Sequence, residues 1–165
     1  MGEARTLRNQ GGIARDETTR WLICRAGMQF CAFGLDSVAE TMRPPPVQRL
    51  PHTPAFVCGL SVIRGQPVPV VDLAVLLGEP EGPSGRVVTV KAGSGIVAVR
   101  VGVVVGVRAI DMQAFGDLPS VAQGAGDEAI AAVGMLDAEL LLLLRSSYLI
   151  SEALAQELRA AGAAS

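Results

Sequence analysis

Residues 86–110 read RVVTVKAGSGIVAVRVGVVVGVRAI and contain the clearest signal of fold in the chain. Three valine-rich segments, at residues 86–91, 96–101 and 103–110, are too short and too β-branched for helices. Glycines at positions 93, 95 and 102 lie between these segments, where hairpins need turns. The stretch therefore predicts a meander of three strands.

Similar short apolar segments lie on both sides of this meander. We expect a hairpin joined by Ala26-Gly27, a two-residue turn at Gly65-Gln66, a helical turn within Leu35–Met42, a loop over residues 111–128 and a terminal helix over residues 148–160. The remaining expected strands cover residues 21–24, 29–33, 60–64, 67–73, 130–136 and 139–144. About nine short strands with Gly/Pro turns are typical of all-β barrels or a sandwich.

Composition excludes several classes of protein. Of the 165 residues 50% are apolar and 18% are charged, so the chain is not disordered as a whole. A net charge of −2, scattered basic residues and 4% aromatics argue against a nucleic-acid-binding groove. The longest purely apolar run, Leu140–Leu144, is far shorter than the ~20 residues that a membrane helix needs. Without a signal-peptide pattern, we expect a cytoplasmic protein with no membrane insertion and a flexible tail over residues 1–18.

The residues that commonly carry chemistry do not form a recognisable site. Cys24, Cys31, Cys58 and the single His52 are not spaced as in zinc modules, so we expect buried reduced thiols and a solvent-facing histidine. Gly93 to Ala98 formally fits a nucleotide-binding glycine motif, but a strand rather than a helix follows, which favours a hairpin turn. The sequence therefore predicts no catalytic residue, no cofactor, no metal and no enzyme activity.

Several short motifs occur in one register between residues 38 and 73. They are Val38-Ala39-Glu40, Leu50-Pro51, TPAFVCGL at residues 53–60, Ile63-Arg64-Gly65 and VPVVDL at residues 68–73. Together they resemble the CheW family of chemotaxis coupling proteins, with weaker similarity from about Arg20 to Leu144. The chain departs from the family pattern at Thr41, Val62 and Arg145, where that family usually has isoleucine, asparagine and an acidic residue.

The resemblance implies two small five-stranded SH3-like barrels packed together. They would form a CheW-like domain over residues 19–150, with the terminal helix packing on the barrels. The implied function is a non-catalytic adaptor that couples a CheA-type histidine kinase to the cytoplasmic helices of methyl-accepting chemoreceptors, recruited to membrane receptor arrays. One alternative is a CheW-like scaffold of another chemosensory pathway, such as twitching motility or cyclase control. A third reading is a small-molecule-binding barrel or enzyme.

The resemblance also implies partner-binding positions. Val38 and Glu40 fall where the family contacts its partners, and Arg64 falls at its signature arginine beside a groove between the barrels. We assign Leu60 and Val62 to the same surfaces, since an adaptor needs exposed apolar area with charges at its rim. The residues alone leave alternatives open: Arg64 would equally fit a bond to local carbonyls or Asp72, and the three apolar residues would equally fit a barrel core.

Overall fold

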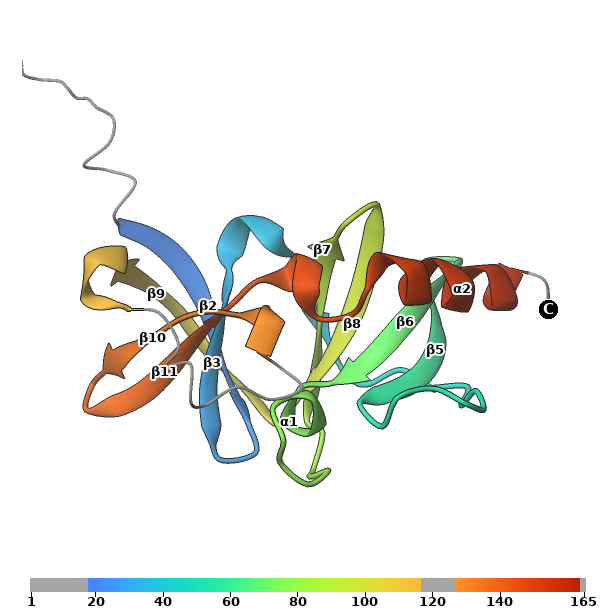
Figure 1. Ribbon diagram of the computed structural model, residues 1–165, viewed down its shortest axis with the longest axis horizontal. Coiled ribbons are helices and arrows are strands. Elements are labelled where there is room, and N and C mark those ends of the chain that lie inside the picture. Colours follow the sequence, from blue (N-terminus) through green and yellow to red (C-terminus); the bar gives the residue numbers. More distant parts are fainter. Residues whose placement is uncertain (1–17, 117–126, 164–165) are drawn as a thin grey trace, which may run out of the picture.

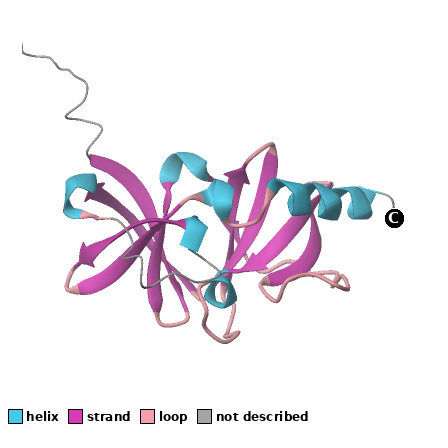
Figure 2. Cartoon of the chain, in the orientation of Figure 1, coloured by secondary structure: helices cyan, strands magenta, loops and turns pink. Residues whose placement is uncertain are grey.

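Strands dominate the computed structural model, which describes residues 18–116 and 127–163 (Figure 2). They form two five-stranded sheets, which confirms the predicted all-β class. The first sheet has the strand order β10-β11-β3-β2-β9, and the second sheet has the order β4-β7-β8-β6-β5. Figure 1 shows them side by side, with the first sheet on the left and the second on the right.

The two sheets draw on the chain differently. The first sheet joins distant segments, namely β2 (Thr18–Ala26), β3 (Gln29–Gly34), β9 (Val103–Asp111), β10 (Ile130–Leu136) and β11 (Glu139–Leu144). The second sheet uses one continuous stretch, with β4 (Val38–Met42), β5 (Val57–Ile63), β6 (Gln66–Asp72), β7 (Arg86–Ala92) and β8 (Gly95–Val101). Helical elements are short, namely α1 (Leu73–Leu76), α2 (Glu152–Ala163) and the 3-10 turns η2 (Leu35–Ser37), η3 (Met112–Ala114), η5 (Asp127–Ala129) and η6 (Ser146–Tyr148).

Strand pairing follows the same pattern in both sheets. In the first sheet the hairpin β10–β11 is antiparallel, β11 is parallel to β3, and β3–β2 and β2–β9 are antiparallel. In the second sheet the hairpin β5–β6, the parallel pair β6–β8 and the antiparallel pairs β8–β7 and β7–β4 follow in the same order. The parallel pairing of β6 with β8 begins at Val70, beyond Pro67 and Pro69, so the missing proline N–H groups cost no bond to β8.

Neither sheet closes into a barrel within the described residues, which corrects the expectation of SH3-like barrels. In the described residues the backbone pairing between the two edges of each sheet is limited to an isolated bridge, between Gln48 and Leu60 in the second sheet and between Gly116 and Val133 in the first. In the second sheet Pro44-Pro45-Pro46 follows β4, and proline cannot donate ladder hydrogen bonds. Pairing with β5 therefore occurs only at Gln48, whose N–H donates to the Leu60 carbonyl at 2.7 Å.

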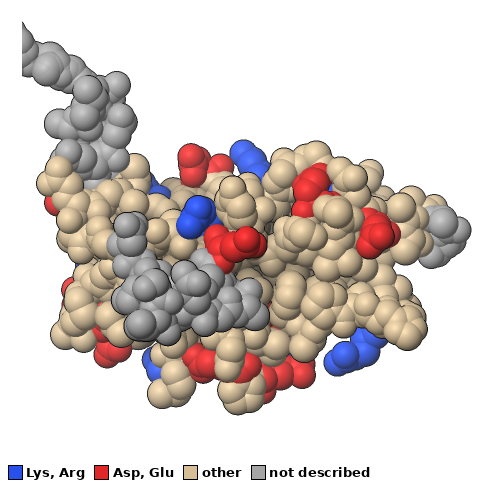
Figure 3. Space-filling view, in the orientation of Figure 1, with Lys and Arg blue, Asp and Glu red and all other residues tan. Residues whose placement is uncertain are grey.

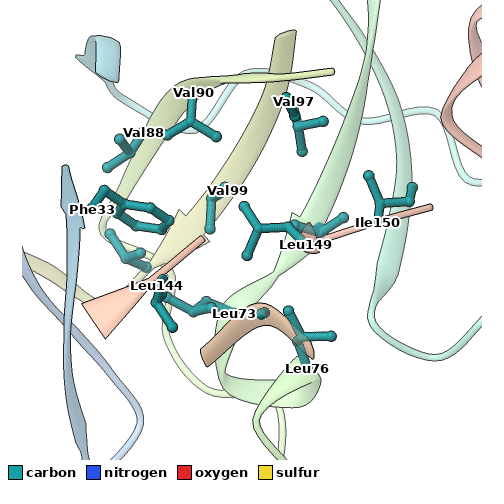
Figure 4. Packing of buried hydrophobic residues seen from close by; sticks show 14 of the residues in the cluster. Phe33, Leu73, Leu76, Val88, Val90, Val97, Val99, Leu144, Leu149 and Ile150 are labelled. Atoms are coloured by element: carbon teal, nitrogen blue, oxygen red, sulfur yellow. The ribbon is translucent and has the colours of Figure 1, made fainter. Parts of the chain in front are cut away.

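The largest cluster of buried side chains lies between the two sheets. Phe33 and Leu144 from the first sheet meet Val88 and Val99 from the second (Figure 4). Each sheet also buries its other face in a smaller cluster, which is built around residues such as Leu143 in the first sheet. Central strands are thus buried on both faces, which explains their nearly continuous apolar runs.

Local predictions differ from the structure at several places. The meander expected over residues 86–110 is divided between the sheets, because β7 and β8 pair in the second sheet whereas β9 pairs with β2 in the first. The turn between β2 and β3 is Gly27-Met28, since Ala26 pairs with Gln29.

The helical turn expected within Leu35–Met42 covers only Leu35–Ser37, because the next residues form the edge strand β4. The turn between β5 and β6 is Arg64-Gly65 rather than Gly65-Gln66. The terminal helix begins at Glu152 rather than at residue 148, because the hydroxyl of Ser151 accepts a hydrogen bond from the N–H of Leu154 and caps the helix.

Two predicted segments fall partly or wholly where the structure gives no description. The expected tail over residues 1–18 lies outside the described residues except for Thr18, where β2 begins. Most of the loop expected over residues 111–128 lies outside them as well.

Candidate functional site

Glu40 and Arg64, both predicted from the motif positions, form a two-pronged ion pair. The Arg64 Nε donates to Glu40 Oε2 at 2.9 Å, and Nη2 donates to Oε1 at 2.8 Å. Glu40 lies on β4 and Arg64 on the turn after β5, so the pair joins the two edge strands of the second sheet. Asp72, the other partner considered for Arg64, instead caps α1 by accepting from the N–H of Val75.

The turn that carries Arg64 explains its position. Arg64 and Gly65 have φ values of +53° and +78° and connect Ile63 to Gln66, which face each other in the strand pairing. Two consecutive positive φ values define the hairpin turn that matches the right-handed twist of paired strands. A non-glycine residue at positive φ is strained. In this turn conformation the guanidinium of Arg64 reaches Glu40 on β4.

Glu40 is held from the backbone side as well. Its N–H donates to the hydroxyl of Thr89 at 3.2 Å, and that hydroxyl donates to the Glu40 carbonyl at 3.3 Å. Thr89 lies opposite Glu40 on β7 and is buried. Hydrogen bonds from Arg64 lower the pKa of the Glu40 carboxyl below its ordinary value of 4.5, so the pair is fully charged at neutral pH.

A hollow of about 570 Å³ opens beside this ion pair. Its apolar lining comes from Ile63, Val68 and Ile96, which belong to or pack on the smaller buried cluster of the second sheet. Further lining residues are Ala39, Glu40, Arg64, Gln66, Pro67, Thr89, Ser94, Gly95 and Arg159. We call this feature the rim hollow; every lining residue belongs to the second sheet, its turns or α2.

The groove between the sheets is a separate feature. It measures about 230 Å³ and is lined by the β2–β3 turn on one side and by residues such as Asp72 and Arg100 on the other. Neither Glu40 nor Arg64 lines it. The structure therefore corrects the expected place of Arg64: it lies at the rim hollow of the second sheet, not at the groove between the sheets.

The three apolar residues predicted for the partner surface have different environments. Leu60 is 6% exposed and belongs to the cluster between the sheets. Val38 is half-buried against the same cluster. Val62 is 75% exposed, so it is the one of the three that offers a free apolar surface.

Sequence reasoning missed two features of the charged surface. Arg108 on β9 donates through Nη1 to Asp137 Oδ2 at 2.9 Å, which gives the first sheet an ion pair between its edges as well. Arg159 on α2 lines the rim hollow, although the sequence showed only an amphipathic helix there. A charged residue within an apolar strand was the signal for Arg108, whereas nothing in the local sequence connected Arg159 with Arg64.

The residues with potential chemistry lie apart from one another. Cys24 and Cys31 are free and buried, as predicted, and burial raises the pKa of the Cys24 thiol to about 12. Cys58 is half-buried, and Arg100 donates to its sulfur at 3.3 Å. His52 is exposed in a loop. Among residues 18–116 and 127–163, no cluster of His, Cys, Asp and Glu has the makings of a metal site.

The helices and the charge distribution of the described residues can be compared with those of membrane-spanning and nucleic-acid-binding proteins. None of the helices in the described ranges combines the length and the apolar character needed to span a bilayer. On the face seen in Figure 3, charged side chains lie singly or in small groups among uncharged residues. This pattern differs from the broad basic surface typical of nucleic-acid binding.

Comparisons with known proteins agree with this geometry. A solved structure, that of the scaffolding protein TtCheW from Thermoanaerobacter tengcongensis, matches with a TM-score of 0.71 and 19% identity, covering 79% of this chain and 91% of that one. A probable chemotaxis protein CheW of Rhizobium etli is 36% identical over 69 residues, which is 41% of this chain and 44% of the relative. Protein FrzA of Myxococcus xanthus is 35% identical over 78 residues, 46% of this chain and 49% of the relative.

The two curated relatives are thus matched over a little under half of their length. The family comparison extends further, because the model of the CheW-like domain matches residues 20–154. That range includes both sheets apart from the first two residues of β2, the Glu40–Arg64 pair and the start of α2. The chain belongs to the family of CheW-like domains.

Proposed function

We propose that this protein is a non-catalytic adaptor that couples a CheA-type histidine kinase to methyl-accepting chemoreceptors in the cytoplasm. The observation that carries the proposal is the two-pronged Glu40–Arg64 pair at the edge of an apolar hollow of about 570 Å³. Membership of the CheW-like family and the names of the chemotaxis relatives support it. No bond is made or broken at such a site; its work is done by contact.

The rim hollow suits the side chains of an amphipathic helix. An apolar side chain from a receptor helix would enter between Ile63 and Ile96, as in the helix-in-groove mode of recognition. The guanidinium of Arg64 uses one edge on Glu40 and keeps its other donors for a partner, since its side chain is 77% exposed. Val62, next to Ile63 on β5, adds exposed apolar surface outside the hollow.

A single contact of this kind gives modest affinity. Interfaces of roughly 800 Å² per partner are often only micromolar when they are transient. Recruitment to a receptor array would then rely on many such contacts held together, which raises the effective concentration of each partner. We propose that the kinase binds a different surface, so that one copy can hold both partners at once.

The test uses the purified chain with a CheA-type kinase and a cytoplasmic receptor fragment from the same organism. Wild-type protein should join the two in a pull-down, and Glu40→Lys should lower receptor affinity more than about tenfold. Arg64→Asn should do the same while tolerating the positive φ of the turn. Arg108→Ala, which breaks the other ion pair, is the matched control and should bind the receptor as wild type does.

Two outcomes would overturn the proposal. One is a wild-type protein that binds neither partner. The other is wild-type binding by both Glu40→Lys and Arg64→Asn. Melting curves accompany each variant, because a variant that unfolds would make the pair structural and remove it from the binding surface.

A second candidate is a scaffold of another chemosensory pathway, such as one for twitching motility or cyclase control. The observation in its favour is that one relative, protein FrzA, is not named a chemotaxis protein, although its 35% identity is close to the 36% of the chemotaxis relative. The same pull-down distinguishes the two candidates when receptors and kinases from each chemosensory gene cluster of the organism are compared.

A further inference from the structure

The helix α2 forms one wall of the rim hollow. Ala155 and Leu158 are buried against the cluster between the sheets, and the helix contacts β6 and β5 (Figure 1). Near its end, a Cβ on Gly162 would lie 2.6 Å from the Cβ of Pro67, so the helix lies tightly against the start of β6. At its beginning, Glu152 accepts from the hydroxyl of Ser94 at 2.6 Å. Both ends of α2 are therefore anchored around the hollow.

Arg159 brings a second guanidinium from this helix to the hollow. Its Nη2 donates to the Ile96 carbonyl at 3.1 Å, and the residue is half-buried. A Cβ on Gly95 would lie 2.7 Å from the Arg159 Cζ, so glycine there leaves space for the planar group. Arg159 is thus held in place at the wall and does not swing freely in solvent.

The charges around the hollow do not balance. Arg64 and Arg159 are both lining residues, and Glu40 is the carboxylate that lines it with them. Glu40 is bound to Arg64 through both oxygens, whereas no carboxylate of the described residues lies within 4 Å of Arg159. Glu152 attracts Arg159 at longer range, but its hydrogen bonds come from Ser94 and Gln156, and it does not line the hollow. Among its lining residues the hollow therefore has an apolar floor and one more cation than carboxylate, and Arg159 is the cation without a carboxylate in contact.

We propose that Arg159 makes the rim hollow selective for a receptor segment that carries a carboxylate next to its inserted apolar side chain. This proposal rests on the proposed function. A docked segment excludes water from Arg159, and a half-buried guanidinium that loses water without gaining an acceptor is costly. An aspartate or glutamate on the segment removes that cost and adds a charge-assisted hydrogen bond. Arg159 lies beyond residues 20–154, so this selectivity belongs to the part of the chain outside the family match.

The experiment measures affinity of the full chain for the cytoplasmic receptor fragment by calorimetry at low and high salt. Arg159→Gln should weaken binding about tenfold and reduce its salt dependence, since one charge contact is lost. Arg159→Glu should weaken it further, and Arg159→Lys should retain part of the affinity. The control is Arg86→Gln, which removes an exposed arginine at the start of β7 away from the hollow and should leave affinity unchanged.

A second set of receptor fragments identifies the acceptor. Each aspartate or glutamate of the fragment is changed to its amide in turn. One such change should weaken binding to the wild-type chain and have no effect on Arg159→Gln, which is the signature of direct coupling in a double-mutant cycle.

The outcomes separate this proposal from the proposed function. Wild-type affinity for Arg159→Gln and Arg159→Glu would overturn the selectivity while leaving the adaptor function intact. If all three Arg159 variants lose affinity equally and also melt at a lower temperature, Arg159 only holds α2 in place. That result would also overturn the selectivity. Coupling of Arg159 to the kinase in place of the receptor would overturn the choice of partner. A wild-type chain that binds no receptor fragment would instead overturn the proposed function.

Discussion

In both sheets an ion pair joins the two edge strands, but the positions of the acid and the arginine are exchanged between the sheets. In each, the edges meet through one isolated bridge and one arginine–carboxylate pair at a hairpin turn with positive φ. In the second sheet the acid, Glu40, lies on the edge strand and the arginine lies on the turn. In the first sheet Arg108 lies on the edge strand and Asp137 on the turn. The backbone plan is repeated, whereas the charge pattern is reversed.

The sheets also differ in what covers them. The second sheet has α2 beside its rim hollow, with Leu60 buried in the same cluster as Ala155 and Leu158 of that helix. The first sheet exposes alternate valines along the edge strand β9, with Val103 53%, Val105 57% and Val107 44% exposed. A shared backbone plan therefore supports two chemically different surfaces, and differences in partner choice must come from side chains.

Gly59, beside the bridge of the second sheet, should be far more sensitive to substitution than Gly116, in the bridge of the first. Gly59 has a φ of +140°, and a Cβ there would collide with the carbonyl oxygen of Gln48, which takes part in the bridge. Gly59→Ala should therefore lower the free energy of unfolding by about 3 kcal/mol or more. Gly116→Ala, at the corresponding bridge, meets no atom within 4 Å and should cost less than about 1 kcal/mol.

Urea unfolding of both variants measures this difference. Equal losses of stability for the two alanine variants would show that the bridges are equally constrained and would break the comparison. A stable Gly59→Ala variant would show that β5 moves away from Gln48 at little cost.

Exchanging the charges of the Glu40–Arg64 pair tests separately whether the pair holds the edges of the second sheet together and whether it binds the receptor. The double variant Glu40→Arg/Arg64→Glu gives the second sheet the polarity of the first and keeps an ion pair between its edges. An exposed pair adds little to stability in either polarity, so the melting temperature should stay near that of the wild type. Receptor affinity should fall more than about tenfold, because the partner meets a charge of the wrong sign.

The reciprocal exchange, Arg108→Glu/Asp137→Arg, is the matched control in the first sheet. It should leave affinity for the receptor fragment unchanged. Loss of receptor binding in both double variants, or in neither, would contradict the assignment of receptor recognition to the second sheet.

The sequence predicted hairpins in both sheets but no pairing between distant segments, for a physical reason. A hairpin joins neighbouring segments, so local apolar runs and the glycines of the 93–95 turn suffice to indicate it. The parallel pairing of β11 with β3 places Leu141 opposite Phe30, and no local pattern records a contact over that separation. The same limit applies to Leu35–Met42, where pairing with β7 overrides the local preference for a helical turn.

The sequence predicted the residues of the candidate site but not their arrangement in space. The motif resemblance singled out Glu40 and Arg64, yet their contact depends on curling of the sheet, which brings opposite edges together. Leu60 and Val62 show the complementary limit, because alternation along a strand cannot reveal that one position is buried by a helix from the far end of the chain while the other is exposed.

The smallest effect we predict is on the titration of the two carboxyl groups. Hydrogen bonds from Arg64 and Arg108 lower the pKa of Glu40 and of Asp137 below their ordinary values of 4.5 and 3.8. A carboxyl with a lowered pKa stabilises the folded state above its ordinary pKa, and that contribution is lost as the pH falls through the lowered value. Arg64→Asn should return the pKa of Glu40 toward 4.5 and leave the pKa of Asp137 unchanged. Arg108→Ala should return the pKa of Asp137 toward 3.8 and leave the pKa of Glu40 unchanged. Carbon-13 NMR titration of the side-chain carboxyls measures both pKa values at once. A changed pKa of the distant carboxyl in either variant would mean that the two ion pairs are coupled through the cluster between the sheets and do not act independently.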